Sequence, residues 1–487
     1  MEFKEEEIEK MVQEVLNRLG STSVGEIRDG ALFARTNRAP SLISPRVIHS
    51  SVSAAIAAAK QAQKVFQEMG LELRRKIIDA IRKAGVDNAD RLAKLAHQET
   101  GMGQWEDKVK KNILVSLKTP GVEDLQPAKA YTGDKGLTLV ELAPFGVVAS
   151  VTPSTNPTAT IINNAISILS AGNSIVFAPH PKAKLCCQET MKILDEAITS
   201  AGGPANLINT FEPLTEESTL ALLKHPEVDM TMVTGGPGIV KLALTTGAVR
   251  KTICAGPGNP PVIVDETAEI ASAVNGIIDG ASFDNCVLCT GEKEVIIVES
   301  IREKFLAEFR KDVRVFELTL DQINELAKKV FQFSDTGKAM GLNRSLVGKN
   351  ADIIAREIGL NLAESVRLLW SEVPNDHPFV WIEQLMPVLP ITSVKDVDAA
   401  IDLAKRVEGG NHHTASIYSM HVGNITKAAR ALACSIFVKN GPNFMGLGVG
   451  EGFATMSIGT PTGDGLTKPT HFSRPLHCSM VGHLRIV

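Results

Sequence analysis

The first twenty residues of the 487-residue chain carry apolar side chains at helical spacing. Ile8, Met11, Val12, Val15, Leu16 and Leu19 recur at i, i+3, i+4 and i+7 positions, which predicts an amphipathic helix. Gly20 is a natural stop for this helix. Residues 21–50 show no sustained period and indicate a linker. The pattern leaves two alternatives open, a helix docked on its own domain and a helix that binds a groove of a partner.

Further along, helical and strand-like patterns alternate. Residues 51–118 are rich in helix formers, whereas GLTLVELAPFGVVASVTP (136–153) is rich in β-branched residues and predicts strands. The short apolar runs SIVFAP and MTMVT predict buried strands between helical stretches, and the alternation recurs after residue 290 with EVIIV. Alternation of this kind is typical of parallel α/β sheets. Two α/β domains are the simplest expectation.

Charge and composition narrow the class of protein. Lys and Arg number 51 and Asp and Glu 55, so the formal net charge is −4. This balance argues against a nucleic-acid binder and against a polybasic membrane-surface protein. No apolar run approaches the roughly 18–20 residues of a membrane span. Seven cysteines, with Cys186 and Cys187 adjacent, fit reduced thiols in a reducing compartment. We therefore expect a cytosolic globular enzyme.

A C-x-x-C pair, Cys286 and Cys289, stands just before the predicted strand EVIIV. A structural zinc site needs four ligands, and the sequence holds no second pair at suitable spacing. A redox dithiol should follow a strand, whereas this pair precedes one. Two interpretations remain open from the residues alone, namely buried inert cysteines and a single nucleophilic thiolate.

Two glycine-rich segments could approach a ligand. VTGGPGIV (233–240) lies between a predicted strand and a predicted helix, where the backbone can approach a phosphate. It is not a G-x-G-x-x-G fingerprint, so an ordinary turn remains an alternative. The glycine and proline loop ICAGPGNPPVIVDE (253–266) could line an active site or merely turn a corner.

Eight motifs occur together in one order. They are TPSTNP (152–157), FAPHP (177–181), VTGGPG (233–238), AGPGNPPVIVDETA (255–268), ASFDN (281–285) followed by Cys289, HPF (377–379), EQLMPVLP (383–390) and SIFVKNGP (435–442). Together they resemble the aldehyde dehydrogenase superfamily. More narrowly, they resemble the coenzyme-A-acylating acetaldehyde and propionaldehyde dehydrogenases of bacterial microcompartments. The resemblance runs from about residue 51 to the last residue.

The resemblance implies an aldehyde dehydrogenase-like α/β fold with two Rossmann-like domains, a small oligomerisation β-flap and the N-terminal amphipathic helix. It also implies a homo-oligomer, a dimer or a tetramer. The expected divisions are a targeting helix at 1–20, a linker at 21–50, a dinucleotide-binding domain at 51–127 and 143–255, a catalytic domain at 256–455, and oligomerisation elements at 128–142 and 456–487.

The resemblance also assigns roles, one position at a time. Cys289 matches the family nucleophile, and Cys286 falls where relatives carry an Asn. Asn156 matches the amide of the oxyanion hole, with Thr155 as the alternative and as a cofactor contact. The remaining expected cofactor contacts are His180 and Pro181 near the adenosine ribose, Thr234, Gly235 and Gly236 at the dinucleotide turn, and Glu383 and Pro387 near the nicotinamide ribose. No metal is expected, and no chemical role is assigned to His377, His412 or His413.

One catalytic residue of the hydrolytic relatives is missing from this chain. Hydrolytic relatives carry a water-activating glutamate where this chain has Ala255, and without a positioned base the attack of water should be slow. The expected function is therefore NAD-dependent oxidation of a short-chain aldehyde to acyl-CoA, through a cysteine thiohemiacetal and an acyl-enzyme thioester. Propionaldehyde is favoured and acetaldehyde comes next. The alternatives are a hydrolytic aldehyde dehydrogenase and an inactive shell-binding relative.

The resemblance finally changes the interpretation of residues 1–20. Related enzymes often begin with a short amphipathic helix that directs them into the microcompartment shell, which favours the partner-binding alternative. The expected partners are thus the aldehyde, coenzyme A and shell proteins, and the expected location is the lumen of a cytoplasmic microcompartment. Neither nucleic acid nor a membrane is an expected partner. The sequence leaves the choice between NAD and NADP open.

Overall fold

The computed structural model describes residues 47–126, 128–246, 250–333 and 339–487. The helix predicted at 1–20 and most of the linker predicted at 21–50 lie outside these residues. Both remain predictions.

The first sheet has six parallel strands in the order β1-β6-β5-β4-β7-β8. These strands are β1 Ile48–His49, β4 Val147–Thr152, β5 Ser174–Pro179, β6 Ile208–Phe211, β7 Met230–Thr234 and β8 Lys251–Ala255. Every residue of β4 and β5 is buried. Alternate side chains explain this burial, because Val148 and Ile175 join one apolar cluster whereas Val147 and Val176 join another. A parallel sheet covered on both faces accounts for the continuous apolar runs in the sequence.

Helices supply the two covering layers. The cluster that contains Val148 draws on α3, α6 and α7, and the cluster that contains Val147 draws on α2, α8 and α9. The helix α6 is buried at all 14 positions. The helices of this part are α2 Val52–Gln67, α3 Leu71–Asp87, α4 Ala89–Thr100, α5 Trp105–Lys118, α6 Pro157–Ser170, α7 Lys184–Ser200, α8 Glu216–Lys224 and α9 Pro237–Thr246, with the 3-10 turns η1 Val122–Leu125 and η2 Pro181–Ala183.

A second sheet has seven parallel strands in the order β11-β14-β15-β10-β9-β16-β17. The strands are β9 Pro261–Val264, β10 Glu294–Val298, β11 Val315–Glu317, β14 Leu368–Glu372, β15 Val388–Val394, β16 Thr414–Tyr418 and β17 Ile436–Lys439. The helices are α10 Ile270–Ser282, α11 Arg302–Phe309, α12 Leu320–Val330, α13 Ala351–Arg356, α14 Pro378–Trp381, α15 Val397–Glu408 and α16 Val422–Leu432. The 3-10 turn η3 Phe283–Cys286 joins α10 to the loop before β10.

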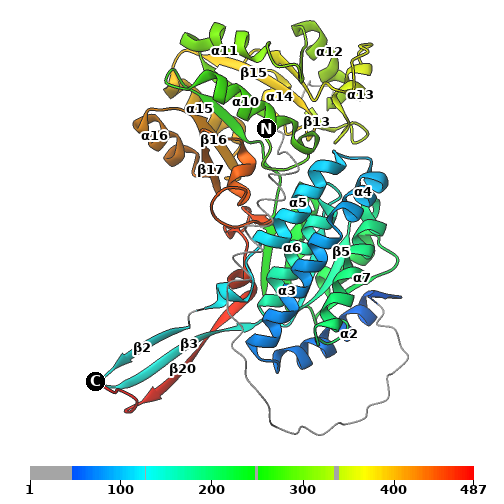
Figure 1. The fold of residues 1–487 in the computed structure, drawn as a ribbon, viewed down its shortest axis with the longest axis vertical. Helices are drawn as coiled ribbons and strands as arrows, with labels where there is room; N and C mark the ends of the chain where they lie inside the picture. The colour runs from blue at the N-terminus through cyan, green and yellow to red at the C-terminus, as the bar shows by residue number, and fades with distance from the viewer. Residues whose placement is uncertain (1–46, 127, 247–249, 334–338) are drawn as a thin grey trace, which may run out of the picture. The chain divides into compact units, whose positions relative to one another are not determined.

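A third, antiparallel sheet pairs segments that are far apart in the sequence. The strands β2 Lys129–Gly133 and β3 Gly136–Pro144 form a hairpin, and β20 Ser473–Val481 pairs with β3 (Figure 1). Every residue of β20 except Ser473 is exposed. The expected oligomerisation elements fall on these strands, and their role remains a prediction.

The predicted α/β class with two parallel sheets is confirmed. The domain boundary expected at 255/256 falls between β8 and β9, although the division into domains is itself a prediction. Within the part of the chain that the structure describes, no helix is long and apolar enough to cross a membrane.

Candidate functional site

The loop before Cys289 has a strained backbone. Asp284, Asn285 and Cys286 are consecutive non-glycine residues with φ values of 47°, 52° and 56°. A left-handed residue of this kind costs on the order of 1–3 kcal/mol. Hydrogen bonds from neighbouring elements hold the turn, because the Asp284 N–H donates to Asp107 (2.9 Å) and the Gln104 N–H donates to the Asp284 carboxylate (2.7 Å). The strain places the residues that follow in one defined position.

The two cysteines of this loop occupy different environments. Cys286 is buried, and its Sγ lies 3.4 Å from the Glu292 carbonyl oxygen and 3.2 Å from the Lys293 Nζ. Cys289 is partly exposed. Only Cys289 of the pair can therefore meet a substrate without a rearrangement of the loop. This exposure is consistent with a nucleophilic Cys289, which remains a prediction.

Charged groups around Cys289 act on its thiol in opposite directions. Removal from water and the Glu383 carboxylate raise the pKa of Cys289 to about 12, against the Lys293 and Lys111 cations, which lower it. Burial likewise raises the pKa of Glu383 to about 7, against Lys293 and a backbone hydrogen bond from Gly258. The buried Lys293 Nζ donates to the carbonyl oxygens of Cys286 (2.8 Å) and Leu288 (3.3 Å). Lys293 thus both holds the loop and favours the thiolate.

Glu383→Gln should lower the pKa of the Cys289 thiol, because it removes the negative charge that opposes the thiolate. At a fixed, mildly alkaline pH, the rate at which iodoacetamide alkylates Cys289 should rise, since the thiolate is the nucleophile. Peptide mass spectrometry follows Cys289 separately from the exposed Cys478. An unchanged or slower alkylation rate would contradict the electrostatic coupling.

Asn156, expected in the oxyanion hole, immediately precedes α6 and is 9% exposed. Its Nδ2 donates to the Thr155 Oγ1 at 3.3 Å, and its Oδ1 accepts from the Lys111 ammonium. The same ammonium donates to Asp284, in the turn before Cys289. The structure therefore joins Asn156, through one buried cluster of polar side chains, to residues 284–289, called the nucleophile loop below after the expected role of Cys289.

The turn expected against the dinucleotide follows β7. The Thr234 Oγ1 lies 2.9 Å from the Ser457 Oγ, and the Gly235 N–H donates to the Ala255 carbonyl (3.1 Å). A Cβ at Gly236 would meet no atom within 4 Å. The backbone is thus open at a helix start, which is where a phosphate can be held. This opening fits a dinucleotide.

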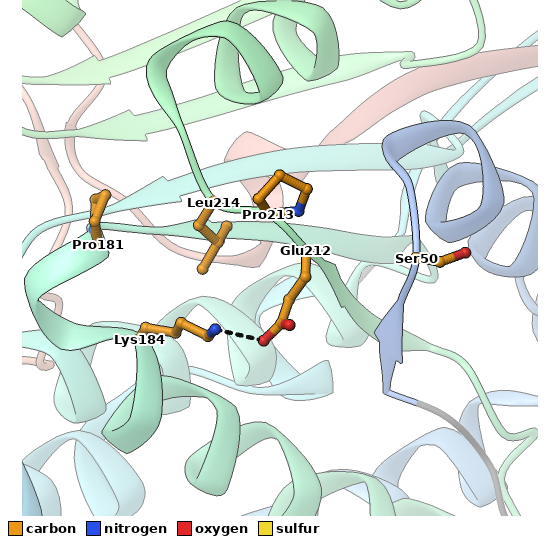
Figure 2. Close-up of a pocket in the computed structure, with 6 residues that line it drawn as sticks. All are labelled: Ser50, Pro181, Lys184, Glu212, Pro213 and Leu214. Atoms are coloured by element: carbon orange, nitrogen blue, oxygen red, sulfur yellow. Dashed lines mark ion pairs between the residues drawn. The ribbon is translucent and has the colours of Figure 1, made fainter.

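His180 and Pro181 follow β5 beside a surface pocket of about 570 Å³ (Figure 2). The lining residues are Ser50, Pro181, Lys184, Glu212, Pro213 and Leu214. Figure 2 shows Lys184 and Glu212 facing each other, and their ion pair measures 2.7 Å. Burial and then the Lys182 and Arg344 cations lower the pKa of His180. A pocket with a hydroxyl, a carboxylate and apolar walls can accept a nucleoside.

The expected cofactor contacts Glu383 and Pro387 lie before β15, and His377 lies at the start of α14. The Pro387 carbonyl accepts from the Leu369 N–H at 3.0 Å. Gln384, next to Glu383, donates to the carbonyls of Lys293 (3.0 Å) and Val388 (2.8 Å), which ties the Glu383 segment to the nucleophile loop. The His377 Nδ1 accepts from the Phe379 N–H (3.3 Å) and caps α14. We therefore interpret His377 as the residue that caps α14.

The structure adds a residue to which the sequence assigned no role. His413 is buried, its Nδ1 lies 2.9 Å from the Thr414 Oγ1, and its Nε2 has no partner among the described residues. A Cβ at Gly258 would lie 2.8 Å from the His413 Cγ and 3.0 Å from the Cys289 carbonyl oxygen. The imidazole therefore lies beside the nucleophile loop. Burial and the Lys293 cation lower the pKa of His413 to about 4, so the ring is neutral at physiological pH.

Ala255 occupies the position at which hydrolytic relatives are expected to carry a glutamate. Ala255 ends β8 and is 3% exposed, and its carbonyl accepts from the dinucleotide turn. No carboxylate is supplied at this point of the chain. Within the described residues, no group of three or more His, Cys, Asp or Glu side chains is placed to hold a metal ion.

Comparison with known proteins gives a consistent result. The model of the aldehyde dehydrogenase family matches residues 42–453. An acetylating acetaldehyde dehydrogenase of Bilophila wadsworthia is 44% identical over 505 residues, covering 100% of both chains. A propionaldehyde dehydrogenase from the fucose utilisation microcompartment of Clostridium phytofermentans superposes with a TM-score of 0.87 at 40% identity, covering 91% of this chain and 100% of that one. A Rhodopseudomonas palustris propionaldehyde dehydrogenase with bound CoA and an acylated cysteine gives 0.87 at 41%, with 91% and 100% coverage.

Proposed function

Because the chain belongs to the aldehyde dehydrogenase family, we propose that it oxidises a short-chain aldehyde to acyl-CoA with NAD as oxidant. Propionaldehyde is the preferred substrate and acetaldehyde the next. One observation carries this proposal, namely a partly exposed Cys289 in a strained loop with Ala255 in place of a water-activating carboxylate. The acylated cysteine and bound CoA of the R. palustris structure support it.

Cys289 acts first. Its sulfur attacks the carbonyl carbon of the aldehyde as a thiolate and forms a thiohemiacetal. Lys293 and Lys111 favour the thiolate, and Glu383 opposes it. The negative charge that develops on the former carbonyl oxygen is stabilised by the Asn156 amide and the Cys289 N–H. A donor positioned for this charge supplies roughly 3–4 kcal/mol of transition-state stabilisation.

The residues that would hold the dinucleotide are Thr234, Gly235 and Gly236 at the open turn, Pro181 at the surface pocket, and Glu383 and Pro387 near the nicotinamide ribose. When bound, NAD would supply the hydride acceptor needed for oxidation of the Cys289 adduct to a thioester. The chain's own contribution is orientation. Gln384 holds the Glu383 segment to the nucleophile loop, and the Thr234 contact to Ser457 holds the turn.

Coenzyme A then takes the acyl group. Its thiol attacks the thioester carbonyl, and the Cys289 sulfur leaves as the new carbon–sulfur bond forms. Exchange between thioesters is nearly isoenergetic, so the preceding oxidation supplies the energy conserved in acyl-CoA. The neutral imidazole of His413 lies beside the nucleophile loop, and its buried Nε2 has no partner among the described residues. Water competes poorly, because no carboxylate stands at Ala255 to activate it.

NADH production from propionaldehyde should depend on coenzyme A beyond the first turnover, because the acyl-enzyme is released only by the thiol. Steady-state absorbance with and without coenzyme A, using aldehydes of two to four carbons, measures both this dependence and the chain-length preference. Sustained turnover to a carboxylic acid without coenzyme A would favour the hydrolytic alternative. The failure of aldehyde and NAD to form any acyl-enzyme would favour the inactive shell-binding alternative.

We also propose that residues 1–20 bind microcompartment shell proteins and that the enzyme works as a dimer or tetramer inside the shell. The amphipathic pattern of residues 1–20 and the microcompartment origin of the C. phytofermentans neighbour support this placement. The exposed strand β20, which pairs with β3, supports the oligomer.

Deletion of residues 1–20 should leave the kinetic constants unchanged and release the enzyme from shell particles. Co-sedimentation of the full chain and the truncated chain with purified shells measures this difference. Loss of folding on truncation would instead support a helix docked on its own domain.

A further inference from the structure

Two lysines of α5 are buried against a single carboxylate. The side chains of Lys108 and Lys111 are 3% and 4% exposed, and both ammonium groups bond to the Asp284 carboxylate, which is fully buried. Asp107 adds a second negative charge nearby, although it also pairs with Lys110 and Arg367. Burying ammonium groups is expensive unless hydrogen bonds compensate. The contacts that these two lysines make are therefore specific ones.

Each lysine also contacts the segment that carries Asn156. The Lys108 Nζ donates to the Thr155 carbonyl at 3.3 Å, and the Lys111 Nζ donates to the Asn156 Oδ1. An ammonium group has three donors and no acceptor. The atom of the Asn156 amide that faces Lys111 must therefore be its oxygen.

This constraint determines where the amide nitrogen points. With its oxygen on Lys111, the Asn156 NH₂ group faces the opposite way, and one of its two hydrogens bonds to the Thr155 Oγ1 at 3.3 Å. The second hydrogen has no partner among the described residues and can donate to a ligand. An amide turned the other way would present its oxygen to an oxyanion, which is repulsive.

We propose that Lys111 is a positioning residue for the oxidation, which orients the Asn156 amide so that its NH₂ group donates to the oxyanion on the Cys289 adduct. Through Asp284, the same ammonium ties this amide to the strained turn that precedes Cys289. The proposal rests on the proposed function, because it takes Asn156 as the oxyanion donor. Lys108 has the supporting task of holding the Thr155 carbonyl.

The electrostatics agree with this geometry. Lys111 lies close enough to Cys289 for its charge to lower the pKa of the thiol, where it acts with Lys293 against Glu383. Burial lowers the pKa of Lys111 itself to about 8, although Asp284 and Asp107 raise it and Lys108 lowers it further. Lys111 therefore remains mostly protonated near neutral pH.

The test is a double-mutant cycle on Lys111 and Asn156. Lys111→Met keeps the length of the side chain, removes the donor and leaves Asp284 paired with Lys108. We expect Lys111→Met to slow acyl-enzyme formation in a single turnover roughly tenfold or more, with the KM for NAD unchanged. In an Asn156→Ala background, the same change should cost clearly less, because only the effect of the Lys111 charge on the Cys289 thiol remains. Lys110→Met, on the exposed side of α5, is the matched control and should keep full activity.

Equal effects of Lys111→Met in both backgrounds, or no effect in either, would overturn the proposal. Full activity of Asn156→Ala would also overturn the proposal, because it would remove the oxyanion role of Asn156. The proposed function would fail instead if the unmodified enzyme formed no acyl-enzyme with propionaldehyde and NAD, so the two failures are distinguishable. A second variant covers a loss of folding in Lys111→Met. Asn156→Asp can pair with Lys111 and lacks the NH₂ donor, so we expect its melting temperature to be retained and its single-turnover rate to fall. Retained activity in Asn156→Asp would overturn the proposal.

Discussion

Cys289→Ser should abolish both NADH production and acyl-CoA formation. A serine hydroxyl is far harder to deprotonate than a thiol, and the surroundings of Cys289 already oppose its anion by burial and by the Glu383 charge. An alkoxide at this position is therefore not reached near neutral pH. Absorbance at the NADH band measures the redox step, and intact mass spectrometry after mixing with propionaldehyde and NAD measures the acyl-enzyme. Both signals should disappear in this variant.

Cys286→Ser is the matched control for this loss. Cys286 is 1% exposed, and its Sγ contacts Lys293 and the Glu292 carbonyl rather than solvent. A serine hydroxyl can keep both contacts, so most of the activity should remain. Loss of activity in Cys286→Ser together with retained activity in Cys289→Ser would reverse the assignment of the nucleophile.

Asn156→Ala should lower kcat by roughly 10²–10³-fold, the usual effect of removing one oxyanion donor, with a smaller change in KM. The reason is that the amide donates most strongly to charge that exists only in the transition state. Single-turnover acylation rates measure the effect without interference from NADH release. Folding should persist, because Lys111 keeps its contact with Asp284.

Asn88→Ala provides the matched control for Asn156→Ala. Asn88 also immediately precedes a helix without capping it through its side chain, and that helix is α4. Its Nδ2 donates to the Ala84 carbonyl at 2.9 Å, away from the nucleophile loop. We expect this variant to keep full activity. An equal loss in both variants would indicate a general effect on helix starts and would remove the catalytic role of Asn156.

Strands and helices of the described residues were predictable where burial repeats along the chain. The run SIVFAP became β5 and EVIIV became β10, because a strand covered on both faces must be apolar at every position. The helix predicted after SIVFAP became α7, which ends at Ser200, just before Gly202 and Gly203. These patterns are local, so neighbouring residues are enough to specify them.

The site was less predictable because its contacts join distant segments. The resemblance nominated Cys289, yet nothing in the C-x-x-C spacing separates it from Cys286. Lys111 has no distinguishing neighbours on α5, and its role follows only from its contacts with Asn156 and Asp284. His413 and the Cys289 carbonyl both lie against Gly258, which is far from each of them in the sequence. Local hydrophobic periodicity does not predict contacts between segments that are far apart in the sequence.

The sequence by itself determined the parallel α/β class, the resemblance to CoA-acylating aldehyde dehydrogenases and the absence of a carboxylate at Ala255. It could do so because period, composition and residue identity are properties of the chain alone. Only the tertiary structure decided which thiol of the pair is accessible, which atom of the Asn156 amide faces Lys111, and which charges act on Cys289. Exposure, hydrogen bonding and pKa depend on distances between segments that meet only when the chain folds.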